Sequence, residues 1–288
     1  MNEKSKQKLS QTLPIPEKII RFFWDLGRSG LRELLYQKWS LERYISSPLD
    51  LETDKKVTII VPSYHASRAR NLEPLIRMAL KCNFVEKIII SNHNPDIKLE
   101  DWVKTNDSRV KLINHSVRRG CGYGWIVASQ EKNADYFIVI DDDMLIYPQQ
   151  LAVLFQQLIN QPEIPHGFIG RRADGEYVMS QELEVEFLYN IYAVTQTHIQ
   201  NYLEYTKEII DNGYASQESI EYWADDIVVS KSGIGHPRIH QAGSIRQCKT
   251  TKTSGVATFT ENQFDGHRLQ VYQALIKMKS ETTTPHLA

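Results

Sequence analysis

Three consecutive carboxylates, Asp141, Asp142 and Asp143, directly follow the apolar run Tyr136–Ile140. Adjacent acids repel one another, and a bare strand end gives them no reason to cluster. A hard divalent cation would supply that reason, because Mg²⁺ and Mn²⁺ prefer oxygen ligands and keep open positions for substrate phosphates. The simpler alternative is a solvated acidic turn, since charge runs are often merely exposed. The other polar motifs of the chain are needed to distinguish between these two interpretations.

A second acidic pair, Asp225 and Asp226, opens an apolar helical run. The helix dipole favours acids at a helix N-terminus, which would explain the pair without any function. However, Trp223 and Ile227 flank it, so we expect it at the edge of the core. Partial burial beside another acidic cluster is a common way to tune a catalytic carboxylate, so the pair is a candidate for catalysis.

Two arginines, Arg118 and Arg119, precede the glycine-rich stretch 120–124. This stretch lacks the G-x-G-x-x-G spacing of a dinucleotide site and predicts a turn whose backbone closely approaches a phosphate. The arginines could pair with a diphosphate bidentately, or could simply be a basic surface pair. His236 and His240 flank a proline-containing turn and are further candidate metal ligands, although single histidines are more often structural or exposed.

Strands and helices alternate between residues 57 and 140, which predicts a mainly parallel sheet with helices on both faces. The expected strands cover 57–61, 86–91, 110–113 and 136–140, and the expected helices cover 69–81 and 124–132. Every strand ends in polar residues, and ligands of open α/β sheets bind at the carboxyl ends of the strands. The polar groups expected at that edge are Ser63, Tyr64, Asn92, Asn94, Asn114 and the aspartate run.

The later part of the chain contains further expected elements. A helix is predicted over 149–160, and the strand 167–170 leads into the basic pair Arg171 and Arg172. Residues 181–210 are expected to be mostly helical or mixed, 250–255 a mobile loop, and 265–279 a final helix that carries Arg268.

The N-terminal part divides into a disordered tail over 1–13 and a basic, amphipathic helical segment over 17–44. Gly27 and Gly30 are expected to split that segment into two helices. It could pack on the main domain, or it could contact a membrane peripherally, because basic amphipathic helices with Trp and Phe can lie in the interface. The expected organisation is therefore 1–50 as tail and helices, 51–280 as one catalytic domain, and 281–288 as a disordered tail.

The bulk composition excludes several classes of protein. With 288 residues, 41% hydrophobic and 24% charged, the chain resembles an ordinary globular enzyme. With a net charge of −1, the protein has no overall positive electrostatic field that would attract nucleic acid. Three scattered cysteines, with no apolar signal core and no run of roughly 20 apolar residues, favour a cytoplasmic location, with peripheral membrane contact as the alternative.

The order of these motifs resembles the GT-A fold nucleotide-sugar glycosyltransferases, and is closest to the exostosin-like family 64. The residues that carry the resemblance are Pro62-Ser63-Tyr64, Asn92-His93-Asn94, Arg118-Arg119, Ile140-Asp141-Asp142-Asp143-Met144 (a DXD motif), Gly167-Phe168-Ile169-Gly170-Arg171-Arg172, Ala224-Asp225-Asp226-Ile227 and His267-Arg268. It covers Val57–Lys279 and implies a diphosphate bridged by Mn²⁺ (or Mg²⁺) and a retaining transfer.

The resemblance also implies roles for single residues. Asp143 would hold the metal directly, while Asp141 and Asp142 would contact ribose or metal-bound water. Asp226 would lie beside the transferred sugar, and Arg268 would steady the diphosphate leaving group. The residues expected at the nucleoside, the diphosphate and the donor are Pro62, Ser63, Tyr64, Asn92, Arg118 or Arg119, and Arg172 (or Arg171).

These roles predict a metal-dependent transfer from a nucleotide diphosphate sugar, with a UDP-sugar favoured, to a hydroxyl of a glycan, a lipid-linked molecule or a small molecule. The absence of a strong nucleophile favours retention by attack from the leaving-group face. An inverting enzyme with Asp226 as the general base is the nearest alternative. A metal-dependent phosphohydrolase and a non-catalytic carbohydrate-binding protein remain as further interpretations.

Overall fold

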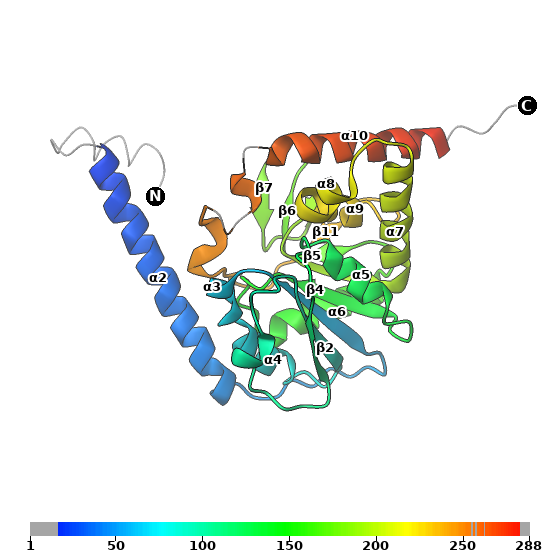
Figure 1. Cartoon of the computed structure of the whole chain (residues 1–288). Helices are drawn as coiled ribbons and strands as arrows, with labels where there is room; N and C mark the ends of the chain where they lie inside the picture. The colour runs from blue at the N-terminus through cyan, green and yellow to red at the C-terminus, as the bar shows by residue number, and fades with distance from the viewer. Residues whose placement is uncertain (1–16, 255, 257, 262, 283–288) are drawn as a thin grey trace, which may run out of the picture.

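The chain folds around an eight-stranded mixed sheet with the strand order β3-β2-β1-β4-β10-β5-β11-β8 (Figure 1). The computed structural model describes residues 17–254, 256, 258–261 and 263–282. The strands are β1 (Val57–Ser63), β2 (Val85–Asn92), β3 (Val110–Asn114), β4 (Tyr136–Ile140), β5 (His166–Gly167), β8 (Leu183–Glu184), β10 (Ile191–Thr195) and β11 (Arg238–Ile239).

The first four strands form the predicted parallel half of this sheet. Ile59 of β1 is paired with Ile88 of β2 on one side and with Ile138 of β4 on the other. All three isoleucines are fully buried. Strands covered on both faces are built from continuous β-branched runs, which is why this half was readable from the sequence.

The other half of the sheet is antiparallel or mixed, and it departs from the prediction. Part of the segment 181–210, expected to be mostly helical or mixed, forms the short strands β8, β9 (Phe187–Leu188) and β10, and only α7 (Gln196–Asp211) is helical. A small sheet with the order β7-β6-β9 joins β9 to β6 (Ile169–Arg171) and β7 (Tyr177–Met179). Strands of two to five residues carry too few side chains to show a clear period.

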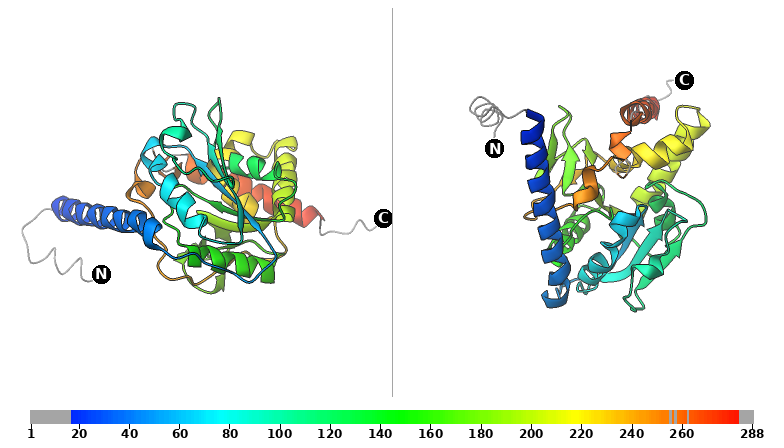
Figure 2. Two further views of the ribbon diagram at one scale, coloured as in Figure 1. Left: turned by 90° about the horizontal axis from the view of Figure 1, so that it is seen from below. Right: turned by 60° about the vertical axis from the view of Figure 1, so that its left-hand side comes forward.

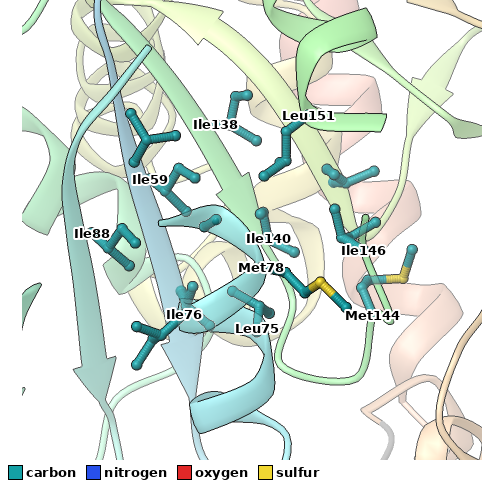
Figure 3. Packing of buried hydrophobic residues seen from close by; sticks show 14 of the residues in the cluster. Ile59, Leu75, Ile76, Met78, Ile88, Ile138, Ile140, Met144, Ile146 and Leu151 are labelled. Carbon is teal, nitrogen blue, oxygen red and sulfur yellow. The ribbon is translucent and has the colours of Figure 1, made fainter. Parts of the chain in front are cut away.

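Helices cover both faces of the main sheet, and each face has its own hydrophobic core. The helical segments are α3 (Ala66–Ala69), α4 (Leu72–Ala79), η1 (Leu99–Asp101), α5 (Tyr123–Ser129), α6 (Pro148–Asn160), α8 (Gln217–Ser219), η2 (Ile220–Ala224), α9 (Asp225–Ser230), η3 (Lys249–Lys252), η4 (Thr258–Thr260) and α10 (Phe264–Thr282). Figure 3 shows the core in which α4 and α6 meet isoleucines from β1, β2 and β4. The opposite core joins the sheet to α5, α7, α9 and α10.

The N-terminal segment forms one continuous helix, α2 (Glu17–Ile45), so the expected break at Gly27 and Gly30 is wrong. A glycine lowers helix propensity by about 1 kcal/mol but keeps its N–H donor, so it need not interrupt a long helix. Trp39 anchors α2 by donating to the carbonyl of Ile146 at 2.9 Å.

Several expectations at the chain ends fall partly outside the described residues. The tail 1–13 lies outside them, as do residues 283–288, whereas residues 281 and 282 belong to α10. The expected loop 250–255 begins inside the short helical turn η3. Among the described residues, no helix combines the length and hydrophobicity that a membrane crossing requires.

Candidate active site

The aspartate triplet lies just beyond β4, and its middle member is fixed by the protein itself. Ser63 donates to Asp142 Oδ2 at 2.8 Å, and Arg68 Nη1 lies 3.4 Å from Asp142 Oδ1. Asn71 donates to the main-chain carbonyl of Asp142 at 2.7 Å. Asp142 is only 4% exposed. Ser63 and Asp142, both expected at this edge of the sheet, therefore meet, and these hydrogen bonds fix the position of the triplet.

Asp143 has one carboxylate oxygen that the protein leaves unsatisfied. Arg68 Nη2 lies 3.2 Å from Oδ2, whereas the buried Oδ1 has no hydrogen-bond partner in the part of the chain that the structure describes. A buried acceptor without a partner is costly, and a divalent cation would satisfy it. The described residues contain no cluster of three His, Cys, Asp or Glu side chains suited to a metal. A cation such as Mg²⁺ does not need such a cluster, because it can be held by one or two carboxylates together with substrate phosphates. The unsatisfied oxygen of Asp143 fits a cation of this kind.

Asp141 is positioned by Asn190, a residue that the sequence did not single out. Asn190 donates to Asp141 Oδ2 at 2.8 Å, and its carbonyl accepts from the Asp141 N–H at 2.8 Å. Asn190 adopts φ +64°, a left-handed conformation that Asn tolerates better than most residues. Burial, together with the charges of Asp143 and Asp225, raises the pKa of Asp141 well above its usual value. A cation bound here would relieve that repulsion.

The second acidic pair lies against the first, although more than 80 residues separate them in the sequence. Asp226 accepts two hydrogen bonds from Arg268, at 2.5 and 2.8 Å. Arg268 also donates to the carbonyl of Trp223 at 2.9 Å. The π-helical turn η2 comes directly before α9, which begins at Asp225. Asp226 and Arg268, for which the resemblance implied separate roles, are therefore joined in one ion pair in the fold.

Asp225 has a different environment from its neighbour. Trp125 donates to Asp225 Oδ2 at 3.0 Å, and the thiol of Cys121 donates to Oδ1 at 3.3 Å. Burial and the charge of Asp226 raise the pKa of Asp225 to about 7. This carboxyl can therefore exchange a proton near neutral pH, whereas its neighbour Asp226 is committed to an ion pair.

The glycine-rich stretch 120–124 forms a turn whose backbone closely approaches that of Glu221, and its approach to a phosphate remains a prediction. The Gly120 N–H donates to Glu221 Oε1 at 2.8 Å, and the Gly122 N–H donates to the Glu221 carbonyl at 2.9 Å. A Cβ at Gly120 would lie 2.4 Å from that carbonyl oxygen, so only glycine fits there. The contact locks the β3–α5 connection to η2, just before Asp225.

The two predicted arginines of that connection have separate environments. Arg118 is exposed and donates to the Tyr64 hydroxyl at 3.2 Å and to Asp96 at 2.6 Å. Arg119 stacks on the ring of Tyr123 with its Cζ 4.6 Å from the centroid. Its buried Nε has no partner among the described residues. Arg119 therefore offers unused donor capacity, whereas Arg118 already has an acid.

Two other predicted contacts point inward. Asn92 is buried and donates to the carbonyls of Asn94 and Ile97 at 2.9 and 2.6 Å, and to Asn114 Oδ1 at 3.1 Å. Pro62 is buried in β1 and packs against Gly124. A Cβ added at Gly124 would lie 3.6 Å from the Cβ of Pro62. Both residues shape the strand ends from within, and their direct contact with a nucleotide remains a prediction.

The two arginines at the end of β6, Arg171 and Arg172, also have different environments. Arg172 is exposed and lies 3.2 Å from Asp174 and 3.4 Å from Glu176, within its own turn. Arg171 lies near Tyr189, where its charge opposes the rise in the pKa of that phenol. Arg171, the alternative to Arg172, is therefore the one placed beside Tyr189.

The histidine candidates do not form a metal site. His240 is buried and contacts His166 at 2.8 Å and Glu182 at 2.9 Å. His236 is exposed and lies 3.7 Å from Glu186. The two side chains thus face different acids, because the intervening turn separates them.

A stacked tyrosine pair lies beside Arg268, within the aromatic-rich segment 177–205 whose sequence was expected to shape the acceptor site. The rings of Tyr177 and Tyr189 lie 5.9 Å apart at 19°, and the Cζ of Arg268 lies 5.6 Å from the Tyr189 centroid. Asp143 contributes to the raised pKa of Tyr177, and Asp226 to that of Tyr189, although burial is the main cause for both.

Comparison with known proteins identifies the fold. A family model described as glycosyl transferase family 2 matches residues 58–216. Among solved structures, a crystal structure of GalNAc-T7 with UDP, GalNAc and Mn²⁺ is similar, with a TM-score of 0.53 at 10% identity. The match covers 77% of this chain and 48% of that one. No curated protein matches the sequence. The expected GT-A fold is confirmed, whereas the exostosin-like assignment is not.

Proposed function

Because the chain belongs to glycosyl transferase family 2, we propose that it moves a sugar from a nucleotide diphosphate sugar to a hydroxyl acceptor. The observation that carries this proposal is that the buried Asp141, which follows β4, feels the charges of both Asp143 and Asp225, although Asp225 comes from α9. The charges of Asp143 and Asp225 both contribute to the raised pKa of Asp141. A UDP-sugar is the favoured donor, since the similar GalNAc-T7 structure contains UDP.

Asp143 and Asp141 are the proposed holders of Mn²⁺ or Mg²⁺. When bound, such a cation neutralises charge on the departing diphosphate. The unsatisfied Oδ1 of Asp143 supports this assignment, as does the raised pKa of Asp141. Ser63 and Asn71 keep the triplet in place from the protein side.

Arg119 and Arg268 supply fixed positive charge for the diphosphate in this proposal. Preorganised charges that need no rearrangement during the reaction are an effective form of transition-state stabilisation. Arg119 retains an unused Nε donor, and Arg268 is held in place by Asp226. Tyr64, which is exposed beside Arg118, is the proposed contact for the base.

We propose retention of the anomeric configuration as the stereochemical outcome. Both carboxylate oxygens of Asp226 already accept from Arg268 in a buried ion pair, so the inverting alternative on Asp226 is disfavoured. A second candidate is inversion with Asp225 as the base, which its pKa of about 7 favours. Product NMR separates the two: an inverted anomer would exclude retention.

The decisive experiment is a metal-dependent binding and transfer assay with the full chain. UDP with Mn²⁺ is expected to raise the melting temperature, because a ligand that binds only the folded protein stabilises it. Asp143→Ala should lose the Mn²⁺-dependent part of that shift and at least about 100-fold in turnover. Asp135→Ala is a matched control, because this exposed acid lies just before the opposite end of β4.

Unchanged Mn²⁺ dependence in Asp143→Ala would contradict the metal assignment. Release of phosphate from the donor, without transfer to any acceptor, would favour a phosphohydrolase instead. The domain limits 51–280 and the acceptor class remain proposals. So does a cytoplasmic location, which the three free cysteines support.

A further inference from the structure

Helix α2 has two different long faces. Its inner face is held by Tyr36 and Trp39, which are 7% and 0% exposed. Its outer face carries four large apolar side chains at helical spacing: Leu31, Leu34, Leu41 and Ile45 are 57%, 68%, 64% and 80% exposed. Residues three, four, seven and eleven positions apart lie on one side of a helix. We call Leu31, Leu34, Lys38, Leu41 and Ile45 the outer stripe.

The outer stripe faces away from the rest of the described molecule. Figures 1 and 2 show α2 leaning out from the sheet, so that its N-terminal half projects beyond the main body. Contiguous exposed apolar surface of this kind marks a site of interaction.

The position of Lys38 distinguishes between two kinds of partner. Lys38 lies within the outer stripe, between Leu34 and Leu41, and its side chain is 64% exposed. At a bilayer surface, a lysine can bury its stem and keep its ammonium at the headgroups. In a two-fold helix pair, the same lysine would be enclosed by leucines and would approach its own copy. The stripe therefore fits a lipid surface better than a second copy of the chain.

The charges of α2 favour an anionic surface. The helix contains six basic and four acidic residues. Glu33 already pairs with Arg70 at 2.8 Å and with Lys249 at 3.1 Å, while Glu42 accepts from Tyr147 at 2.6 Å. Glu33 is thus neutralised by basic residues of the main domain, whereas Glu42 lies 3.6 Å from Lys38 within the helix. Basic amphipathic helices of this composition lie in the plane of the membrane interface.

We propose that the outer stripe of α2 docks the protein on the surface of a bilayer that contains anionic lipid. Docking there would also bring the active site to the membrane. Glu33 contacts Lys249 of η3, and the neighbouring Cys248 donates its N–H to the carbonyl of Asp143 at 2.8 Å. The docking helix is therefore only a few contacts away from the proposed metal-binding acid.

Cosedimentation of the full chain with vesicles tests this proposal without any assay of transfer. The native protein should pellet with phosphatidylcholine vesicles that contain phosphatidylglycerol, and less with phosphatidylcholine alone. Added salt should weaken the interaction. Leu34→Glu combined with Leu41→Glu should lower the affinity at least about tenfold, because both side chains would lose apolar burial.

The matched control is Ser29→Glu combined with Gln37→Glu, which makes the same change in charge at exposed positions outside the stripe. It should lose clearly less affinity than the leucine variant. Equal losses in both variants, or no vesicle binding by the native chain, would overturn the proposal. So would light scattering that shows a native dimer which the leucine variant dissociates. UDP-dependent stabilisation should persist in both variants, so failure of docking is separable from failure of the proposed activity.

Discussion

Arg268 and Asp226 form a buried, two-pronged ion pair that joins α10 to α9. Each terminal nitrogen of the guanidinium donates to a different carboxylate oxygen, at 2.5 and 2.8 Å. The Arg268 guanidinium also lies over the aromatic rings of Tyr189 and Phe264. The last helix of the chain thereby contributes a fixed positive charge to a site whose other groups follow β4 and η2.

Replacing this arginine by lysine should impair function more than stability. Arg268→Lys keeps the charge but loses the planar, bidentate geometry. We expect kcat to fall by about 10²-fold, the usual effect of removing one preorganised group. Arg268→Ala should also cost about 3–5 kcal/mol of unfolding free energy, because it leaves Asp226 buried and unpaired.

Steady-state kinetics and urea unfolding measure these two effects. Arg77→Lys is the control, since its ion pair with Glu73 lies within α4 and is only partly buried. An Arg268→Lys enzyme with native kcat would show that the two-pronged geometry has no role in turnover.

The pKa of Asp225 predicts a pH dependence of stability. Burial and the charge of Asp226 raise this pKa from 3.8 to about 7, so the folded protein holds the proton more tightly than the unfolded chain. The stabilisation is complete below about pH 4 and is lost as the pH rises through about 7. In metal-free buffer this carboxyl should contribute a slope of up to about −1.4 kcal/mol per pH unit within that window.

Urea unfolding of Asp225→Asn across the same pH range tests this slope. The variant cannot titrate at this position, so its advantage over the native protein should grow from acid to alkaline pH. Asp135→Asn, at an exposed acid, should leave the profile unchanged. Parallel profiles for the native chain and Asp225→Asn would contradict the assignment.

Two glycine substitutions should have opposite effects on stability. Gly120→Ala places a Cβ 2.4 Å from the Glu221 carbonyl oxygen and should cost about 1–3 kcal/mol through overpacking. Gly30→Ala has nothing within 4 Å of the new Cβ and should gain about 0.5–1 kcal/mol of helix stability. Thermal unfolding compares the two variants directly, and a gain in Gly120→Ala would mean that the β3–α5 connection can move away from η2.

The neighbouring arginines after β6 should also behave differently. Arg171→Ala removes a charge beside Tyr189 and should lower kcat/KM by about tenfold or more, the effect of losing one polar contact. Arg172→Ala removes only exposed ion pairs with Asp174 and Glu176, so activity and stability should change little. The opposite ranking in the transfer assay would restore Arg172 as the donor contact.

The parallel half of the fold was predictable because its strands are long and buried on both faces. Ile59, Ile88 and Ile138 belong to continuous β-branched runs, and such runs identify strands without reference to the rest of the chain. The antiparallel half was not predictable, since strands such as Arg238–Ile239 are held by pairing partners distant in sequence. Helix α2 was misread as two helices because a glycine lowers helix propensity but keeps its N–H donor, so Gly27 and Gly30 do not interrupt it.

By itself, the sequence determined which residues carry charge and which strands they follow. This was enough to place Asp141, Asp143 and Asp226 among the functional candidates. Only the tertiary structure decided how those charges are divided. Asp142 is anchored by Ser63, Asp226 is committed to Arg268, and Asp225 is left with a pKa near neutrality. The reason is physical: burial and partner distance set the energy of a carboxylate, and both depend on contacts between segments far apart in the chain.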